Sequence, residues 1–288
     1  MEKLLNWSIA NQSEDKETRA KAGAPDPELL AQLFGAAADE PTLMKQNMAV
    51  ISNEEATLEN REIAFDNFEM LIENMDNANN IKNLQLWEPL TKQLNSEHDS
   101  LVKLTCSVIG TAVQNNPESQ EAFLNLPKEN MEILIELSKS SKIEEIKLKS
   151  LYALSNIIRH NEKGYKIFNE SNGWIILAPI LNSSDSSDKL KLRCLSLISA
   201  LLSTGITDEK KNYLQKDYVV KSMLTLLHSE THIGCVDKVL NILNQLVSNK
   251  YEFNKDEIDL ISKAVIDIEK IKEKLSEDDF QSIKSVVK

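Results

Sequence analysis

The chain has 288 residues, of which 41% are hydrophobic and 27% are charged, so most of it is expected to fold. Glycine and proline number seven each, well below their usual share, which argues against a turn-rich β architecture. The formal net charge of −12 argues against nucleic acid as a partner, because binding to phosphates requires a basic surface.

The first 40 residues differ in composition from the rest. A short apolar helix around Leu4 is followed by the charged stretch SEDKETRAKAGAPDP, which is typical of a flexible linker, and then by the leucine-rich run ELLAQLF. Pro41 suits the first turn of a helix. We therefore predict a partly flexible segment over residues 1–40 and a folded domain over residues 41–288.

From about residue 58 the chain repeats. Five ten-residue windows lie 41, 45, 44 and 45 residues apart and begin at Asp66, Ser107, Tyr152, Ser196 and Asn241. The third, sixth and seventh positions of every window are apolar, as in Leu154, Ile157 and Ile158, and these positions share one helical face. A polar loop and a second apolar segment follow each window. The period predicts an all-α, armadillo- or HEAT-like, right-handed superhelical solenoid with helical caps.

Window positions one, five and eight lie opposite the apolar columns on a helical wheel. In a solenoid the same helix of each repeat lines the inner curve, so these positions predict one concave surface. It is either an ordinary solvated face or a partner-binding surface. Its mixture of aromatic, arginine and amide side chains favours binding. The predicted contact residues of this surface are Glu73, Thr111, Gln114, Asn115, Tyr152, Asn156, Arg159 and Ser196.

Signals for chemistry are weak. His228, His232 and Cys235 have a spacing that could ligate a metal, but the stretch HSETHIGC contains a glycine and is typical of a loop between helices. We see no phosphate-binding glycine loop, GxSxG elbow or HExxH motif. The chain is therefore expected not to be an enzyme, and to need no metal and no cofactor.

The three cysteines, Cys106, Cys194 and Cys235, are widely spaced without a CxxC pair, which is typical of reduced thiols in the cytosol or nucleus. The first residues lack the pattern of a signal peptide. The longest apolar run, from Trp174 to Leu181, is too short to cross a bilayer. A cytoplasmic protein is expected, with a nuclear pool left open and no membrane partner.

Several longer stretches of the sequence resemble the fungal Fes-one family. They are LLNWSIAN, PDPELLAQLFG, PTLMK, AFDNFEMLIENMDNANN, LWEPL, IGTAVQNNPESQ and YALSNIIRHN, and the resemblance runs along nearly the whole chain. The family consists of armadillo-type nucleotide exchange factors for heat-shock protein 70 (Hsp70) chaperones, related to the animal heat-shock-protein-binding protein. The resemblance implies a monomer whose concave face embraces one lobe of the chaperone's ATPase domain. ADP release and then client release would follow from this binding.

The resemblance implies two further contact regions. Asn77, Ala78 and Asn79 are expected at the groove edge, where the small side chain of Ala78 would allow close approach of the partner. Arg193 lies about one turn before Ser196 and is expected to pair with a chaperone carboxylate. A solvated residue near the start of a helix is the alternative for Arg193.

The resemblance also implies a role for the N-terminal segment. Its apolar residues are expected to mimic a chaperone client and to enter the peptide-binding cleft; they are Leu29, Leu30, Leu33 and Phe34. The alternative is a small helix docked on the first repeat.

A generic armadillo adaptor with an importin-like peptide groove is the alternative function. Such a groove uses a recurring ladder of tryptophan and asparagine. Only Tyr152 with Asn156 approximates this ladder, and Arg159 would repel a basic peptide.

Overall fold

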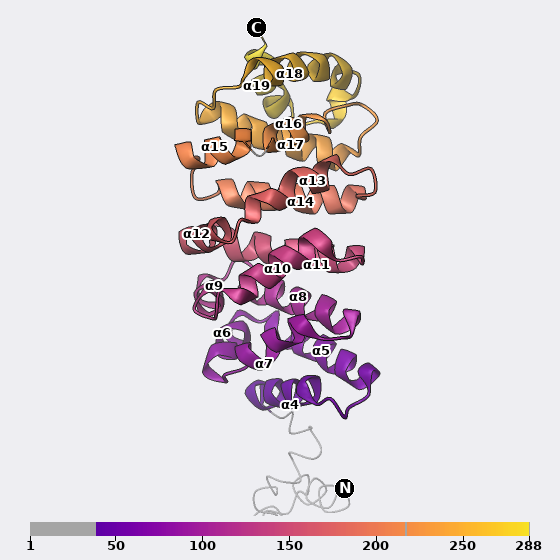
Figure 1. The fold of residues 1–288 in the computed structure, drawn as a ribbon, viewed down its shortest axis with the longest axis vertical. Coiled ribbons are helices and arrows are strands. Elements are labelled where there is room, and N and C mark those ends of the chain that lie inside the picture. Colours follow the sequence, from indigo (N-terminus) through magenta and orange to yellow (C-terminus); the bar gives the residue numbers. More distant parts are fainter. Residues whose placement is uncertain (1–38, 217, 288) are drawn as a thin grey trace, which may run out of the picture.

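The computed structural model describes residues 39–216 and 218–287. Every regular element in these ranges is a helix, and the helices stack into one elongated rod that runs from α4 to α18 and α19 (Figure 1). The predicted all-α solenoid is therefore confirmed. The client-mimic residues of the N-terminal segment lie outside the described residues.

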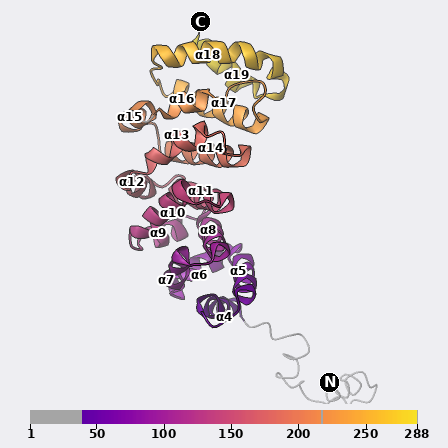
Figure 2. The same ribbon diagram turned by 45° about the vertical axis from the view of Figure 1, so that its right-hand side comes forward.

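The long helices form one continuous layer along the rod. Each packs against the next, and together they are α5 (Leu58–Ile72), α8 (Asp99–Val113), α11 (Glu144–Ile158), α14 (Asp188–Leu202) and α17 (Ile233–Ser248). The predicted windows fall on the C-terminal halves of these helices. The rod is curved in Figure 2, and the long helices line its inner side.

The remaining helices complete each repeat. Short helices follow the long ones along one edge of the rod: α6 (Met75–Asn83), α9 (Pro117–Leu124), α12 (Glu162–Glu170) and α15 (Asp208–Lys216). The outer layer consists of α7 (Trp87–Lys92), η1 (Gln93–Asn95), α10 (Glu129–Ser140), η2 (Gly173–Ile176), α13 (Leu177–Asn182) and α16 (Val219–Leu224). The rod is capped by α4 (Glu40–Ser52) at one end and by α18 (Lys255–Ile268), η3 (Glu269–Lys274) and α19 (Glu277–Val286) at the other.

The apolar columns of the repeat form the core. The five residues at the third window position are fully buried, and they are Phe68, Ile109, Leu154, Ile198 and Leu243. Burial of each such side chain stabilises the fold by about 1.5–3 kcal/mol. Because each repeat buries its faces only against its neighbours, the core runs without interruption along the rod.

The turns after the long helices share one geometry. Asn115, His160, Gly205 and Lys250 are 45 residues apart and have φ angles of 51°, 55°, 99° and 55°. This left-handed conformation ends a helix and redirects the chain. In the first two turns the next residue is an asparagine whose side chain caps the following helix, as the Asn116–Pro117 pair predicts.

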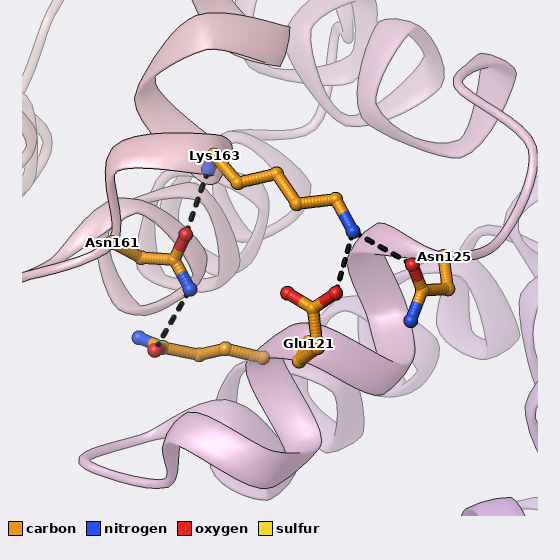
Figure 3. Close-up of polar contacts among 6 residues, drawn as sticks. Glu121, Asn125, Asn161 and Lys163 are labelled. Carbon is orange, nitrogen blue, oxygen red and sulfur yellow. Dashed lines mark hydrogen bonds and ion pairs between the residues drawn. The ribbon is translucent and has the colours of Figure 1, made fainter.

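Polar contacts join neighbouring short helices at the edge of the rod. The ammonium group of Lys163 on α12 lies 2.7 Å from Glu121 Oε1 and 2.6 Å from Asn125 Oδ1 on α9 (Figure 3). The hydrogen bond from Lys163 lowers the pKa of the Glu121 carboxyl below its ordinary value. Because these contacts are exposed, they are expected to add little stability. Within the described ranges, none of the helices is both long and apolar enough to cross a membrane.

Candidate protein-binding face

The inner face is the surface formed by the exposed and half-buried side chains of α5, α8, α11, α14 and α17. A chain of polar contacts crosses its first three helices. Glu69 Oε1 on α5 accepts hydrogen bonds from Ser107 Oγ at 2.6 Å and Thr111 Oγ1 at 2.8 Å on α8. Lys149 Nζ on α11 donates to the same Ser107 Oγ at 2.9 Å. The predicted residue Thr111 therefore helps to hold one helix to the next.

Tyr152 occupies the centre of the inner face. Its hydroxyl donates a hydrogen bond to Gln114 Oε1 on α8 at 2.7 Å. The guanidinium carbon of Arg193 on α14 lies 5.0 Å from the centroid of its ring, and Lys149 Nζ lies 5.8 Å from the same centroid. The structure thus brings together three predicted contact residues from three helices, and cation–π attraction holds the two cations near the ring.

Positive charge gathers beside Tyr152. Lys149, Lys189 and Arg193 line a hollow of about 430 Å³ between α11 and α14, together with Leu148, Leu192 and Ser196. We call this the cationic hollow. Two further cations follow along the same face: Arg159, and Lys238 on α17, whose pKa is lowered by burial and by the nearby Arg159 charge.

Two of the predicted contact residues join helices instead of facing outward. Asn156 is 8% exposed, and its Nδ2 donates to the backbone oxygen of Gly110 on α8 at 3.2 Å. Arg159 is half-buried, and its guanidinium donates to the backbone oxygen of Ser196 on α14 at 3.2 Å. Burial lowers the pKa of Arg159. The expected outward orientation of Asn156 is therefore wrong.

The expected position of the Asn77–Asn79 stretch at the surface is also wrong in part. Ala78 is 2% exposed and Asn77 is 5% exposed. Asn77 Nδ2 donates to the backbone oxygen of Leu71 and to Glu40 Oε2, both at 2.9 Å. The half-buried Asn79 accepts a hydrogen bond from Ser119 on α9 at 3.1 Å. These side chains hold α6 between α4 and α9, because the helix turns them toward the rod.

The remaining predicted residues lie at the surface. Glu73 and Asn115 are exposed at the ends of α5 and α8, and Gln114 and Arg193 are exposed beside Tyr152. Ser196 is half-buried and donates to the backbone oxygen of Leu192 one turn earlier. Their role in binding a partner remains a prediction.

Three lysines of the inner face lie outside the sequence windows, namely Lys149, Lys189 and Lys238. Glu69 and the buried Gly110 lie inside the windows at the fourth position, which the predicted stripe omits. Lys149 and Lys189 precede the windows that begin at Tyr152 and Ser196, although they belong to the same helices. Extending each window by two turns toward the start of its helix would have found both lysines, because residues three, four and seven apart share a face.

Reactive groups and metal ligands do not gather on this face. Burial raises the pKa of the Cys106 thiol to about 12 and that of Cys235 to about 11. His232 caps α17 by accepting the backbone N–H of Gly234 at 3.2 Å. In residues 39–216 and 218–287, no three side chains of His, Cys, Asp or Glu come together as metal ligands would.

The fold defines a class: an armadillo-type helical solenoid whose long helices line a polar inner face. Solved structures agree on the fold. A designed armadillo repeat protein in complex with the peptide (KR)4 is 14% identical with a TM-score of 0.68, over 87% of this chain and 100% of that one. An engineered protein is 18% identical with a TM-score of 0.67, over 86% of this chain and 95% of that one.

Sequence relatives identify the family. Residues 1–81 match the family described as nucleotide exchange factor Fes1, and residues 77–229 match the SIL1/FES1/HPBP1 C-terminal domain. Proteins called Hsp70 nucleotide exchange factor FES1 are 48% identical in Debaryomyces hansenii and 46% in Kluyveromyces lactis, over 100% of both chains in each case. The Saccharomyces cerevisiae protein of the same name is 45% identical, also over 100% of both chains. The chain belongs to the Fes1 family.

Proposed function

We propose that this protein is a nucleotide exchange factor for an Hsp70 chaperone. The observation that carries the proposal is the full-length similarity, at 48% identity over 100% of both chains, to a relative named for this activity. The coupling between the two binding events is reciprocal. An exchange factor that binds the nucleotide-free chaperone more tightly by a given factor therefore weakens nucleotide binding by that factor. ADP release and then client release follow from binding alone, and the protein supplies no catalysis of its own.

The inner face is the proposed contact surface for the chaperone's ATPase domain. Its polar centre is the proposed contact, where the exposed Gln114 and Arg193 lie beside the half-buried Tyr152. Glu73, Thr111 and Asn115 extend this surface toward α5 and α8. Arg193 is expected to pair with a chaperone carboxylate, since the described part of the chain provides no ion-pair partner within 4.0 Å of its guanidinium.

The N-terminal segment completes the proposal. Leu29, Leu30, Leu33 and Phe34 form a short apolar run that a chaperone peptide cleft would accept, and we propose that it displaces bound client. The folded repeats would then promote release of the nucleotide, and the N-terminal segment would promote release of the client. We further propose that the protein is a monomer of the cytoplasm, and that it binds neither nucleic acid nor membrane.

The importin-like adaptor remains the competing function. The likeness to a designed armadillo protein that holds the peptide (KR)4 concerns the fold alone. The inner face carries Lys149, Arg159 and Arg193 where a basic peptide would lie, so like charges would oppose its binding.

Release of a fluorescent ADP from an Hsp70 chaperone tests the proposal. Stoichiometric protein should accelerate release, and Arg193→Ala should remove much of the acceleration. Lys139→Ala is the matched control, because it removes an exposed cation from α10 in the outer layer. Unchanged ADP release in the presence of the wild-type protein would refute the exchange function. Equal activity of the Arg193→Ala variant would refute the placement of the contact.

A further inference from the structure

The cationic hollow brings like charges together in an acidic protein. The net charge of the chain is −12, yet the charged residues that line the hollow are Lys149, Lys189 and Arg193 and include no carboxylate. In the described part of the chain none of these three cations lies within 4.0 Å of a carboxylate oxygen. Clustered cations repel one another and create a positive potential that attracts an anionic group from outside.

The apolar residues of the hollow indicate which kind of anionic group it would bind. Leu148 and Leu192 are half-buried and lie beside the three cations. A surface that combines apolar area with positive charge suits acidic side chains, whose methylene groups can contact the leucines while their carboxylates meet the cations. The matching partner surface is therefore a short projecting segment that carries Asp or Glu.

Arg193 is held in place although it is exposed. Its guanidinium lies 5.0 Å from the centroid of the Tyr152 ring. A free arginine on a surface loses rotamer freedom when a partner binds, and this loss weakens binding. Attraction to the ring restricts Arg193 before the partner arrives, so less entropy remains to be lost.

The Tyr152 ring is itself fixed by α8. A Cβ atom at Gly110 would lie 2.4 Å from Tyr152 Cδ1 and 2.5 Å from Cε1, so the ring can pack this closely only against a glycine. On the same helix, Gln114 accepts the hydrogen bond of the Tyr152 hydroxyl. Two contacts one turn apart thus set the position of the ring, and the ring sets the position of Arg193.

We propose that the cationic hollow receives a carboxylate-bearing segment of the chaperone's ATPase domain, and that Gly110 and Tyr152 are positioning residues that hold Arg193 on its wall. This inference rests on the proposed function, since it names the chemistry by which the same face recognises its partner. Tyr152, which the sequence pattern predicted as a contact residue, thereby acts through Arg193 and need not touch the partner itself.

A double-mutant cycle tests the positioning role. The affinity of the full-length chain for nucleotide-free Hsp70 is measured by calorimetry, with the chaperone's peptide cleft filled by a saturating client peptide. Arg193→Ala should weaken binding about tenfold, as expected for an anchor residue, and should reduce its dependence on salt. Tyr152→Leu should weaken binding roughly 2- to 5-fold, the size of an exposed cation–π contact. In the Arg193→Ala background, Tyr152→Leu should have a much smaller effect, because only Lys149 then remains beside the ring.

Two more variants separate positioning from simple damage. Gly110→Ala should displace the ring and reproduce the loss seen in Tyr152→Leu, without adding to it. Tyr152→Phe keeps the ring and should retain most of the affinity. Should Gly110→Ala fail to fold, the two tyrosine variants carry the test. Lys139→Ala should stay within about 1.5-fold of the wild type, because Lys139 is exposed on α10 in the outer layer and does not line the hollow. Circular dichroism and thermal melting verify the fold of every variant.

The outcomes are distinguishable. Equal losses from Tyr152→Leu in both backgrounds would show that the tyrosine contacts the partner directly, which overturns the positioning role. Unchanged affinity in Lys149→Ala, Lys189→Ala and Arg193→Ala would overturn the hollow as the carboxylate site. Tight binding without faster ADP release would overturn the proposed exchange function. The affinities of the double-mutant cycle would still test the positioning role. Absence of wild-type binding would overturn both.

Discussion

Gln120 on α9 should be among the most sensitive polar positions of the rod. It is 4% exposed, and its Nε2 donates to the backbone oxygens of Asn156 at 2.7 Å and Arg159 at 3.0 Å. Its Oε1 accepts a hydrogen bond from Asn161 Nδ2 at 3.3 Å. One side chain therefore satisfies two carbonyl groups at the end of α11, where the helix has no N–H groups of its own left to offer.

The change Gln120→Leu keeps the approximate volume and removes all three bonds. Each lost hydrogen bond contributes about 1 kcal/mol, and carbonyl groups left buried without a partner cost about 1–3 kcal/mol each, partly offset when water reaches them. We expect unfolding to become easier by about 2–4 kcal/mol. For a chain of this size this corresponds to a melting temperature lower by roughly 4–16 °C.

The assay is urea unfolding followed by circular dichroism, with thermal melting as a second measurement. Gln281→Leu is the matched control, because Gln281 is exposed on α19 and should change the stability by less than about 0.5 kcal/mol. Equal unfolding midpoints for the Gln120 and Gln281 variants would show that the end of α11 finds other hydrogen-bond partners. Gln120 would then not be the residue that stabilises this junction between repeats.

Four further outcomes are expected. Ala78→Arg places a charge at a position that is 2% exposed, so the variant should lose about 3 kcal/mol or more of stability and should no longer accelerate ADP release. Loss of chaperone binding at an unchanged melting temperature would instead indicate that Ala78 contacts the partner. Lys250→Gly should raise the free energy of unfolding by about 0.5–1 kcal/mol, because φ at Lys250 is 55°, and a lowered urea midpoint would contradict this. The pKa of Glu121 is lowered from 4.5 by Lys163, so its stabilisation is present above that value and is lost as the pH falls through the lowered pKa. Acid unfolding curves of Lys163→Met should therefore lose part of this pH dependence, and identical curves would refute it. Deletion of residues 1–35 should leave ADP release intact but slow the release of persistent clients, and equal client release would count against the client mimic.

The long helices and their core could be predicted from the chain alone. The apolar positions that Leu154, Ile157 and Ile158 occupy recur in every repeat at the same spacing. Helical periodicity is a local property, so it can be seen without knowing which helices pack together. The cap formed by Asn116 was predictable for the same reason, since its hydrogen-bond partner is three residues away.

The inner face was only partly predictable. Tyr152, Gln114 and Arg193 were all named from the sequence, but their contact was not, because they come from three helices more than 30 residues apart. Gly110 gave no signal by itself. Its meaning appears only when the ring of Tyr152 is seen to occupy the space of its missing side chain.

The sequence by itself determined the repeat, the buried columns and the polarity of the opposite stripe. The tertiary structure decided which members of that stripe face outward. Asn156 and Gln114 are both polar members of the stripe, and a helical wheel cannot tell a side chain that hydrogen-bonds to the next helix from one that is exposed on the inner face. That difference depends on how closely α8, α11 and α14 pack, because a polar group at the seam between two helices must find its hydrogen-bond partner there.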